Sequence, residues 1–143
     1  MPEALTKDPT VRRARTRVVI ADAHTAVVRE LRALLEPEFE VVGSVGDGRA
    51  LVAVAEELKP DVVVSDVALP LLDGVAAIQE IRRRDPAVRV VFVTVLTEPE
   101  VRQHALAAGA AAFLSKASAG DELVPAVRAA IRGAGDAPQS RFT

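Results

Sequence analysis

Apolar residues gather in five short runs that recur along the chain at intervals of about two dozen residues. The runs are rich in β-branched residues, which favour strands, and they lie at 17–21, 39–43, 61–65, 88–94 and 111–115. The centre of each run is continuously apolar and does not alternate with polar residues. Strands of this kind are buried on both faces, so the pattern predicts a parallel sheet with helices on both sides.

A helical pattern follows each run, with apolar residues three, four or seven positions apart. The clearest sets are Val27, Leu31 and Leu35; Leu51, Val54 and Leu58; Val75, Ile78 and Ile81; and Leu123, Val127 and Ile131. The helix over 101–108 has the least contrast, because it is rich in alanine. Capping boxes are predicted at 97–100 and 118–121, and helix ends at Gly109 and Gly133. The fold class predicted is therefore a doubly wound α/β domain of five βα units.

Composition narrows the classes of protein that fit this pattern. The chain has 143 residues, which predicts one domain, and it has no cysteine, which excludes disulfides and thiolate chemistry. No apolar stretch is long enough to span a membrane and no signal peptide is evident, so we expect a cytoplasmic protein without membrane contact. The net charge is -2, and Phe is the only aromatic residue, which argues against nucleic-acid binding by this domain.

The two ends of the chain differ in composition from the middle. Five of the 18 basic residues lie in Lys7–Arg17, so we expect residues 1–16 to form a basic flexible tail. Residues 17–133 form the predicted domain. Residues 134–143 have the composition of a linker or a C-terminal tail.

Polar residues follow four of the five runs. In a parallel sheet these positions lie at the carboxyl ends of the strands, where ligands of doubly wound domains bind. These residues are Asp22, Asp66, Thr94 and Lys116. A carboxylate can attack an activated phosphoryl group and hold it as an acyl phosphate, and Asp66 is placed for that role. Asp22 would help to hold Mg²⁺, which prefers oxygen ligands. Lys116 would offer positive charge, and Thr94 a hydrogen bond, to the phosphoryl oxygens.

Four fragments, "VVIADAH", "SDVALPLLDG", "VTVL" and "FLSK", carry a resemblance to a known family. From Arg17 to Gly133 the chain resembles the receiver domain of bacterial two-component response regulators, most closely those of the NarL/LuxR type. The resemblance implies a CheY-like, flavodoxin-like fold with strand order 2-1-3-4-5. It also implies that Asp66 is phosphorylated by a sensor histidine kinase, and that the chain catalyses only its own phosphorylation and dephosphorylation.

The same resemblance implies further roles. The main-chain carbonyl of Ala68 would be a third Mg²⁺ ligand beside Asp22 and Asp66, and Phe113 would change rotamer together with Thr94. Homodimers would form through the surface of 101–108, 111–115 and 123–131. DNA would be bound only by an output domain that these 143 residues do not contain.

The chain departs from the family at position 23, where receivers usually have a second acid and this sequence has Ala23. In the family this second acid is the closer metal ligand. One carboxylate fewer lowers the charge of the site, so weaker Mg²⁺ binding and slower phosphorylation are expected.

Other interpretations of the same residues stay open. Asp22 and Asp66 could cap a helix or a turn, as Asp73 is expected to do before a glycine. His24 is expected to be a surface residue, because no second His or Cys is placed to share a metal. Phe113 is as well explained as a core residue.

Three functions compete. The first is a phosphate-dependent receiver. The second is a degenerate receiver that acts as a phosphate-independent interaction or dimerisation module, for which Ala23 is the main support. The third is an enzyme, but "ADAHTAVV" lacks the phosphate-binding loop of flavodoxin-like enzymes and the Asp-x-Asp of haloacid-dehalogenase-type phosphatases.

Overall fold

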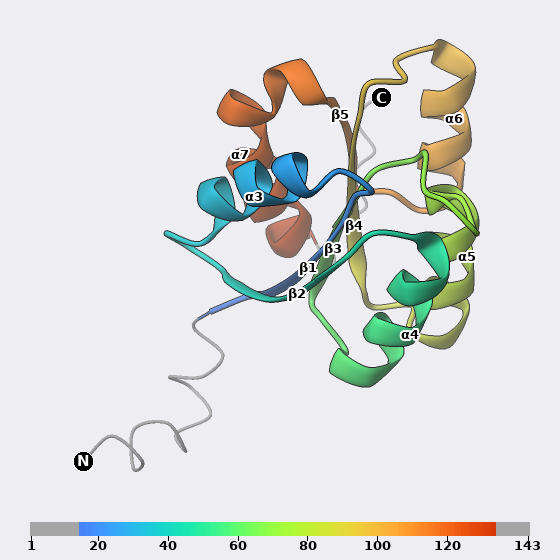
Figure 1. Ribbon diagram of the computed structural model, residues 1–143, viewed down its shortest axis with the longest axis horizontal. Helices are drawn as coiled ribbons and strands as arrows, with labels where there is room; N and C mark the ends of the chain where they lie inside the picture. Colours follow the sequence, from blue (N-terminus) through green and yellow to red (C-terminus); the bar gives the residue numbers. More distant parts are fainter. Residues whose placement is uncertain (1–14, 134–143) are drawn as a thin grey trace.

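A computed structural model describes residues 15–133 and shows a parallel five-stranded sheet between two layers of helices (Figure 1). The strands are β1 (Arg17–Ala21), β2 (Glu40–Val45), β3 (Val62–Ser65), β4 (Arg89–Thr94) and β5 (Ala112–Ser115). Their order in the sheet is β2-β1-β3-β4-β5, and every neighbouring pair is parallel. The predicted fold class and strand order are confirmed. The predicted tails lie outside the described residues, except for Arg15 and Thr16.

Helices cover both faces of the sheet, as continuous apolar strands require. One face carries α3 (Thr25–Leu35) and α7 (Ala119–Arg132), and the other carries α4 (Gly48–Leu58), α5 (Gly74–Arg84) and α6 (Pro99–Ala107) (Figure 1). A short 3₁₀ helix, η1 (Lys116–Ser118), joins β5 to α7. Within residues 15–133, no helix has the length and apolar character needed to cross a bilayer.

Two apolar clusters hold these layers together, because successive strand residues point to opposite faces. In β1, Val18 and Ile20 pack under α3 and α7, whereas Val19 and Ala21 pack under α4 and α5. The central strands β1, β3 and β4 are buried, and the edge strands β2 and β5 are only partly so. The core is therefore densest beneath the three strands whose ends carry Asp22, Asp66 and Thr94.

The helices differ in how firmly they are attached to the sheet. Helix α7 buries Ala119, Leu123, Val127 and Ala130. Helix α6 buries Ala105 alone, in agreement with the low apolar contrast of its sequence. Helix α6 is therefore packed less firmly against the sheet than α7.

Helix starts were predicted only in part. Asp73 caps α5 as expected, since its side chain accepts a hydrogen bond from the Ala76 N–H at 2.9 Å. The predicted capping box at 97–100 is wrong, because α6 starts after Glu98 and no side chain caps it. The box at 118–121 is also wrong. The Ser118 hydroxyl lies 3.1 Å from the Ser115 carbonyl and 3.1 Å from the Glu122 carboxylate, and it accepts no hydrogen bond from a main-chain N–H of α7.

Candidate functional site

Two buried carboxylates meet at the carboxyl edge of the sheet. Asp22 follows β1 and Asp66 follows β3, and these strands are neighbours with Ala21 in register with Ser65. Asp22 is 2 % exposed and Asp66 is 4 % exposed. Because parallel neighbours end at the same level, the two acids lie side by side in a site with little solvent.

The Lys116 ammonium lies between these two acids, as the predicted position at the end of β5 allows. Its Nζ is 2.8 Å from Oδ2 of Asp22 and 3.0 Å from Oδ2 of Asp66. It donates a hydrogen bond to Asp66, whereas its contact with Asp22 is an ion pair in which Oδ2 accepts no well-directed hydrogen bond from the described residues. Two carboxylates and one ammonium leave a net charge of -1 on the cluster.

The remaining carboxylate oxygens accept hydrogen bonds from nearby main-chain N–H groups. Oδ1 of Asp66 accepts from the N–H of Ala68 at 3.2 Å, and Oδ1 of Asp22 accepts from the N–H of His24 at 2.9 Å. Each bond spans two residues and closes a local turn. Neither acid caps a helix: α3 follows His24 without a side-chain cap. The helix-cap alternative is therefore wrong for both, whereas the bond from the Ala68 N–H makes Asp66 the cap of a turn.

Charges within the cluster shift the pKa values of two of its members. Burial raises the pKa of Asp22, but the Lys116 ammonium and the His24 N–H outweigh burial, so this pKa lies below its ordinary value. Burial lowers the pKa of Lys116, but the neighbouring carboxylates of Asp22 and Asp66 outweigh burial, so this pKa is raised. Asp22 and Lys116 therefore stabilise each other in their charged forms.

Thr94 and Phe113 lie on the neighbouring strands β4 and β5, and no described contact joins either of them to the cluster. Thr94 is fully buried at the end of β4, and its Oγ1 accepts a hydrogen bond from the N–H of Leu96 at 3.1 Å. Phe113 faces the α4–α5–α6 side of the sheet, and the Arg102 guanidinium carbon lies 5.9 Å from its ring centroid. The structure thus brings together Asp22, Asp66 and Lys116, with Thr94 tied to the loop after β4.

His24 contacts Asp22, which the sequence did not suggest. Its side chain is 72 % exposed, as expected for a surface residue, but Nδ1 lies 3.2 Å from Oδ1 of Asp22. Asp22 and His24 are two residues apart, the spacing at which an Asp side chain commonly bonds the backbone ahead of it. This spacing is the feature of the sequence from which the contact between Asp22 and His24 could have been predicted.

The residues fit Mg²⁺ in a limited way. Two carboxylates converge on one cation, and Oδ2 of Asp22 is buried without a hydrogen bond from the described residues. Mg²⁺ is commonly held by one or two carboxylates and several waters, which this pair can supply. Across residues 15–133, no three His, Cys, Asp or Glu side chains are grouped to hold a metal. Ala23, which is exposed beside Asp22, adds no ligand.

The loop after β3 is shaped by close backbone contact. A Cβ on Gly74 would lie 2.1 Å from the carbonyl oxygen of Asp66, so only glycine lets α5 start against this segment. Leu71, in the same loop, has a φ of 70° and is 73 % exposed. A left-handed leucine is unfavourable, and such backbone strain is typical of functional sites.

Comparisons with known proteins agree with this geometry. Residues 18–128 match the protein family described as the response regulator receiver domain. The chain is 34 % identical over 119 residues to the transcriptional regulatory protein YxjL of Bacillus subtilis, covering 82 % of this chain and 55 % of that protein. It is 36 % identical over 116 residues to the transcriptional regulatory protein PdtaR of Mycobacterium tuberculosis, covering 80 % and 56 %. The chain thus spans about half the length of these relatives.

Solved structures show the same likeness. The signal receiver domain of NarL from Mycobacterium tuberculosis superposes with a TM-score of 0.79 at 31 % identity, covering 83 % of this chain and 98 % of that one. A LuxR-family response regulator from Aurantimonas sp. SI85-9A1 gives a TM-score of 0.79 at 32 % identity, covering 83 % and 86 %. The likeness extends over nearly all the described residues.

Proposed function

The chain belongs to the response regulator receiver domain family, and we propose that it accepts a phosphoryl group on Asp66 and signals through the resulting acyl phosphate. The observation that carries the proposal is the ammonium of Lys116 beside both Asp66 and Asp22 at the carboxyl edge. A transferred phosphoryl group is held by such positioned charge more than by covalent chemistry.

In the proposed step, a carboxylate oxygen of Asp66 forms a bond to phosphorus. The bond from phosphorus to the donor nitrogen or oxygen breaks, and the donor leaves with that electron pair. Lys116, whose Nζ lies 3.0 Å from Oδ2 of Asp66, is close enough to neutralise charge on the new phosphoryl oxygens. The chain is thus proposed to catalyse its own phosphorylation and dephosphorylation and no other reaction.

Mg²⁺ is the proposed cofactor, and it would neutralise negative charge on the incoming group. Asp22 and Asp66 would hold it, with the main-chain carbonyl of Ala68 as a further oxygen ligand. Since position 23 is alanine, the site has one carboxylate fewer than is usual in the family, and weak affinity for Mg²⁺ is part of the proposal.

The signal is proposed to pass through Thr94. Its Oγ1 accepts from Leu96, and its hydroxyl hydrogen is free to be donated to a phosphoryl oxygen on Asp66. Such a bond would move the loop that leads into α6 and shift Phe113, which faces α6, to another rotamer. The surface of α6, β5 and α7 would then change its packing and favour a homodimer.

The partners are proposed from the family. A sensor histidine kinase is the proposed phosphodonor. Relatives such as YxjL and PdtaR are named as transcriptional regulatory proteins and are about twice as long as the matched region. We therefore propose that any DNA contact belongs to an output domain outside these 143 residues, and that the protein acts in the cytoplasm.

A second function is favoured by two observations. Lys116 already forms ion pairs with both carboxylates without phosphate, and position 23 offers no carboxylate to a metal. A phosphate-independent interaction module would use the same α6–β5–α7 surface constitutively.

Intact-mass measurement after incubation with acetyl phosphate and Mg²⁺ tests the proposal. One phosphoryl group should be added, and it should be labile to hydroxylamine. Asp66→Asn should abolish it, whereas the control Asp73→Asn, which keeps a capping side chain on α5, should retain it. Label that persists in Asp66→Asn would contradict the acceptor assignment. An unlabelled wild-type protein that is dimeric throughout would favour the interaction module.

A further inference from the structure

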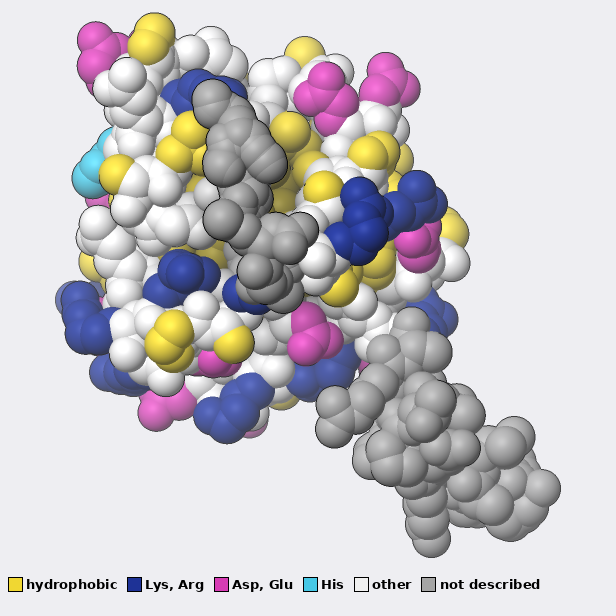
Figure 2. All heavy atoms as spheres, turned by 180° about the vertical axis from the view of Figure 1, so that it is seen from behind, with side chains coloured by type: hydrophobic (Ala, Val, Ile, Leu, Met, Phe, Trp, Pro, Cys, Tyr) yellow, Lys and Arg dark blue, Asp and Glu magenta, His cyan; other side chains and the backbone are white. Residues whose placement is uncertain are grey.

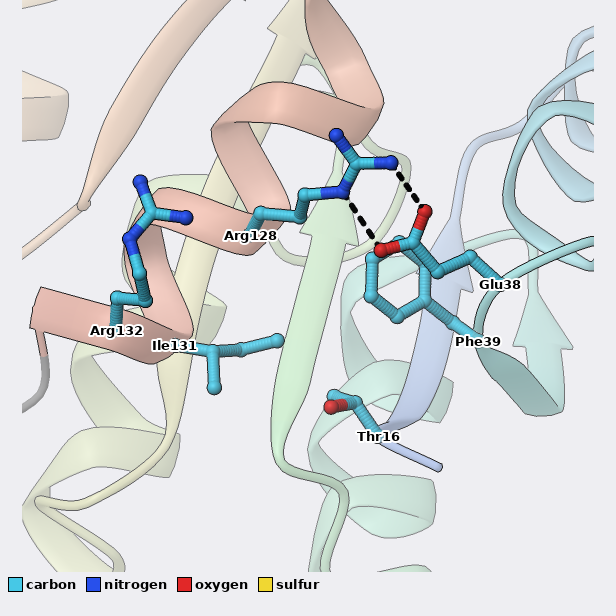
Figure 3. A pocket seen from close by; sticks show the side chains of 6 residues that line it. All are labelled: Thr16, Glu38, Phe39, Arg128, Ile131 and Arg132. Atoms are coloured by element: carbon cyan, nitrogen blue, oxygen red, sulfur yellow. Dashed lines mark hydrogen bonds and ion pairs between the residues drawn. The ribbon is translucent and has the colours of Figure 1, made fainter. Parts of the chain in front are cut away.

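A hollow of about 220 Å³ lies at the amino edge of the sheet, at the opposite end of the strands from Asp66 (Figure 3). It opens between the last two turns of α7 and the segment that joins α3 to β2. Six residues line it: Thr16, Glu38, Phe39, Arg128, Ile131 and Arg132. None of them belongs to the cluster around Lys116, so binding in this hollow is independent of the proposed phosphorylation of Asp66.

The floor of the hollow is apolar. Phe39 is 4 % exposed and is part of the α3–α7 core, and Ile131 packs against the same core while staying partly exposed. Figure 3 shows the Phe39 ring and the Ile131 side chain on opposite sides of the hollow, from different elements. An apolar group of a ligand can therefore be buried here against preformed core packing.

The rim of the hollow is positively charged. Arg128 donates two hydrogen bonds of 2.6 Å to the Glu38 carboxylate, which balances its charge. Arg132 has no carboxylate partner within residues 15–133. Within the part of the chain that the structure describes, Arg15, adjacent to Thr16, donates to the carbonyls of Glu36 and Phe39, at 3.0 and 2.6 Å, and to no carboxylate. Among the lining residues two arginines thus outnumber the single carboxylate of Glu38, and Arg15 adds a positive charge beside Thr16.

Other basic side chains lie at the same edge of the domain as the hollow. The last turns of α5 and α7 carry arginines, and basic side chains lie mainly toward the lower part of the face shown in Figure 2, with acidic ones among them. The volume is below the roughly 300–1,000 Å³ typical of pockets for whole small-molecule ligands. One side chain of a bound polypeptide is the size that fits.

We propose that this hollow is a docking site for an acidic segment of a partner protein, which inserts an apolar side chain between Phe39 and Ile131 and places a flanking carboxylate on Arg132. In a peptide with a carboxylate next to an aromatic residue, the aromatic ring would pack on the apolar floor and the carboxylate would pair with the Arg132 guanidinium. The contact would act at the edge of the domain remote from the carboxylate cluster.

The test uses the full 143-residue chain, labelled with ¹⁵N, and two probe peptides, acetyl-Glu-Phe-Glu-amide and acetyl-Lys-Phe-Lys-amide. The acidic peptide should shift the amide signals of Phe39 and Arg132 with millimolar affinity, and more weakly at high salt, because the charges are exposed. The basic peptide should not. Absent shifts, equal binding of the two peptides, or shifts centred on Asp66 would overturn the proposal.

A variant and a matched control complete the experiment. Arg132→Gln should weaken binding of the acidic peptide about three-fold, as expected for one exposed charge pair. Arg29→Gln removes an exposed arginine of α3 that does not line the hollow, and it should bind like the wild type. Both side chains are exposed, so both variants should fold. Undiminished binding by Arg132→Gln would overturn the proposal.

Discussion

Replacing Lys116 by methionine removes the cation between two buried carboxylates while keeping most of the side-chain volume. The two Oδ2 atoms that contact Nζ are at most about 5.8 Å apart. At an effective dielectric constant of 20, two unit charges at this distance repel each other by about 3 kcal/mol. Removing one partner of a buried ion pair typically costs about 3–5 kcal/mol, which agrees. We therefore expect Lys116→Met to lower the free energy of unfolding by about 3 kcal/mol at neutral pH.

Urea unfolding followed by far-ultraviolet circular dichroism measures this loss, since the chain has no Trp or Tyr for fluorescence. Arg83→Met is the control, because it removes an exposed ion pair with Glu80 and should change stability little. A loss below about 1 kcal/mol in Lys116→Met, with an unchanged denaturant slope, would refute the reasoning. The carboxylates would then not depend on the ammonium.

The pH dependence of stability tests whether the loss in Lys116→Met is electrostatic. In the wild type the pKa of Asp22 is below its ordinary 3.8, so its stabilising contribution is complete above pH 3.8 and is lost as pH falls through the folded value. The pKa of Lys116 is above its ordinary 10.5, so its contribution is complete below pH 10.5 and is lost as pH rises through the folded value. In Lys116→Met, burial acts on Asp22 without the opposing ammonium and favours the protonated form of that acid. The deficit of the variant should therefore shrink as pH falls from 7 toward 4, and a constant deficit would contradict an electrostatic cause.

Two further expectations concern position 23 and the glycines. Ala23→Asp should tighten Mg²⁺ binding in calorimetry, and it should lower stability without Mg²⁺ because it crowds like charges beside Asp22. Equal Mg²⁺ affinity of the wild type and the variant would show that position 23 does not affect the metal site. Gly74→Ala should cost several kcal/mol in urea unfolding, since its Cβ would lie 2.1 Å from a backbone oxygen. Gly120→Ala, with no atom within 4 Å of its Cβ in α7, should be stabilising by about 0.5 kcal/mol, and a comparable loss in both variants would show that steric contact is not the cause.

The strands could be predicted to within one or two residues because a buried parallel strand must be apolar along its whole length. The run 61–65 became β3 at Val62–Ser65, and the run 88–94 became β4 at Arg89–Thr94. The placement of Asp22 and Asp66 followed from the same rule, since it depends only on where neighbouring strands end. These features are fixed by backbone geometry.

Features that depend on side-chain conformation could not be predicted. Lys116 lies 50 residues from Asp66 along the chain, and its contact with both acids depends on the rotamer that the 3₁₀ turn allows. The Thr94 hydroxyl bonds to Leu96, a loop contact with no sequence signature. The hollow beside Arg132 joins three segments of the chain, and no one of them contains a motif for it.

The single buried residue of α6 has a consequence for local unfolding. Amide protection and proteolytic resistance depend on the free energy of the smallest opening that exposes a segment, and this opening need not be global. Detaching α6 would expose Ala105 and a few partly buried neighbours, whereas detaching α7 would expose four buried residues and open the core over β4 and β5. By this measure α6 is the helix expected to open at the lowest free energy. That helix belongs to the surface proposed to carry the signal, so rearranging it would leave the rest of the fold closed.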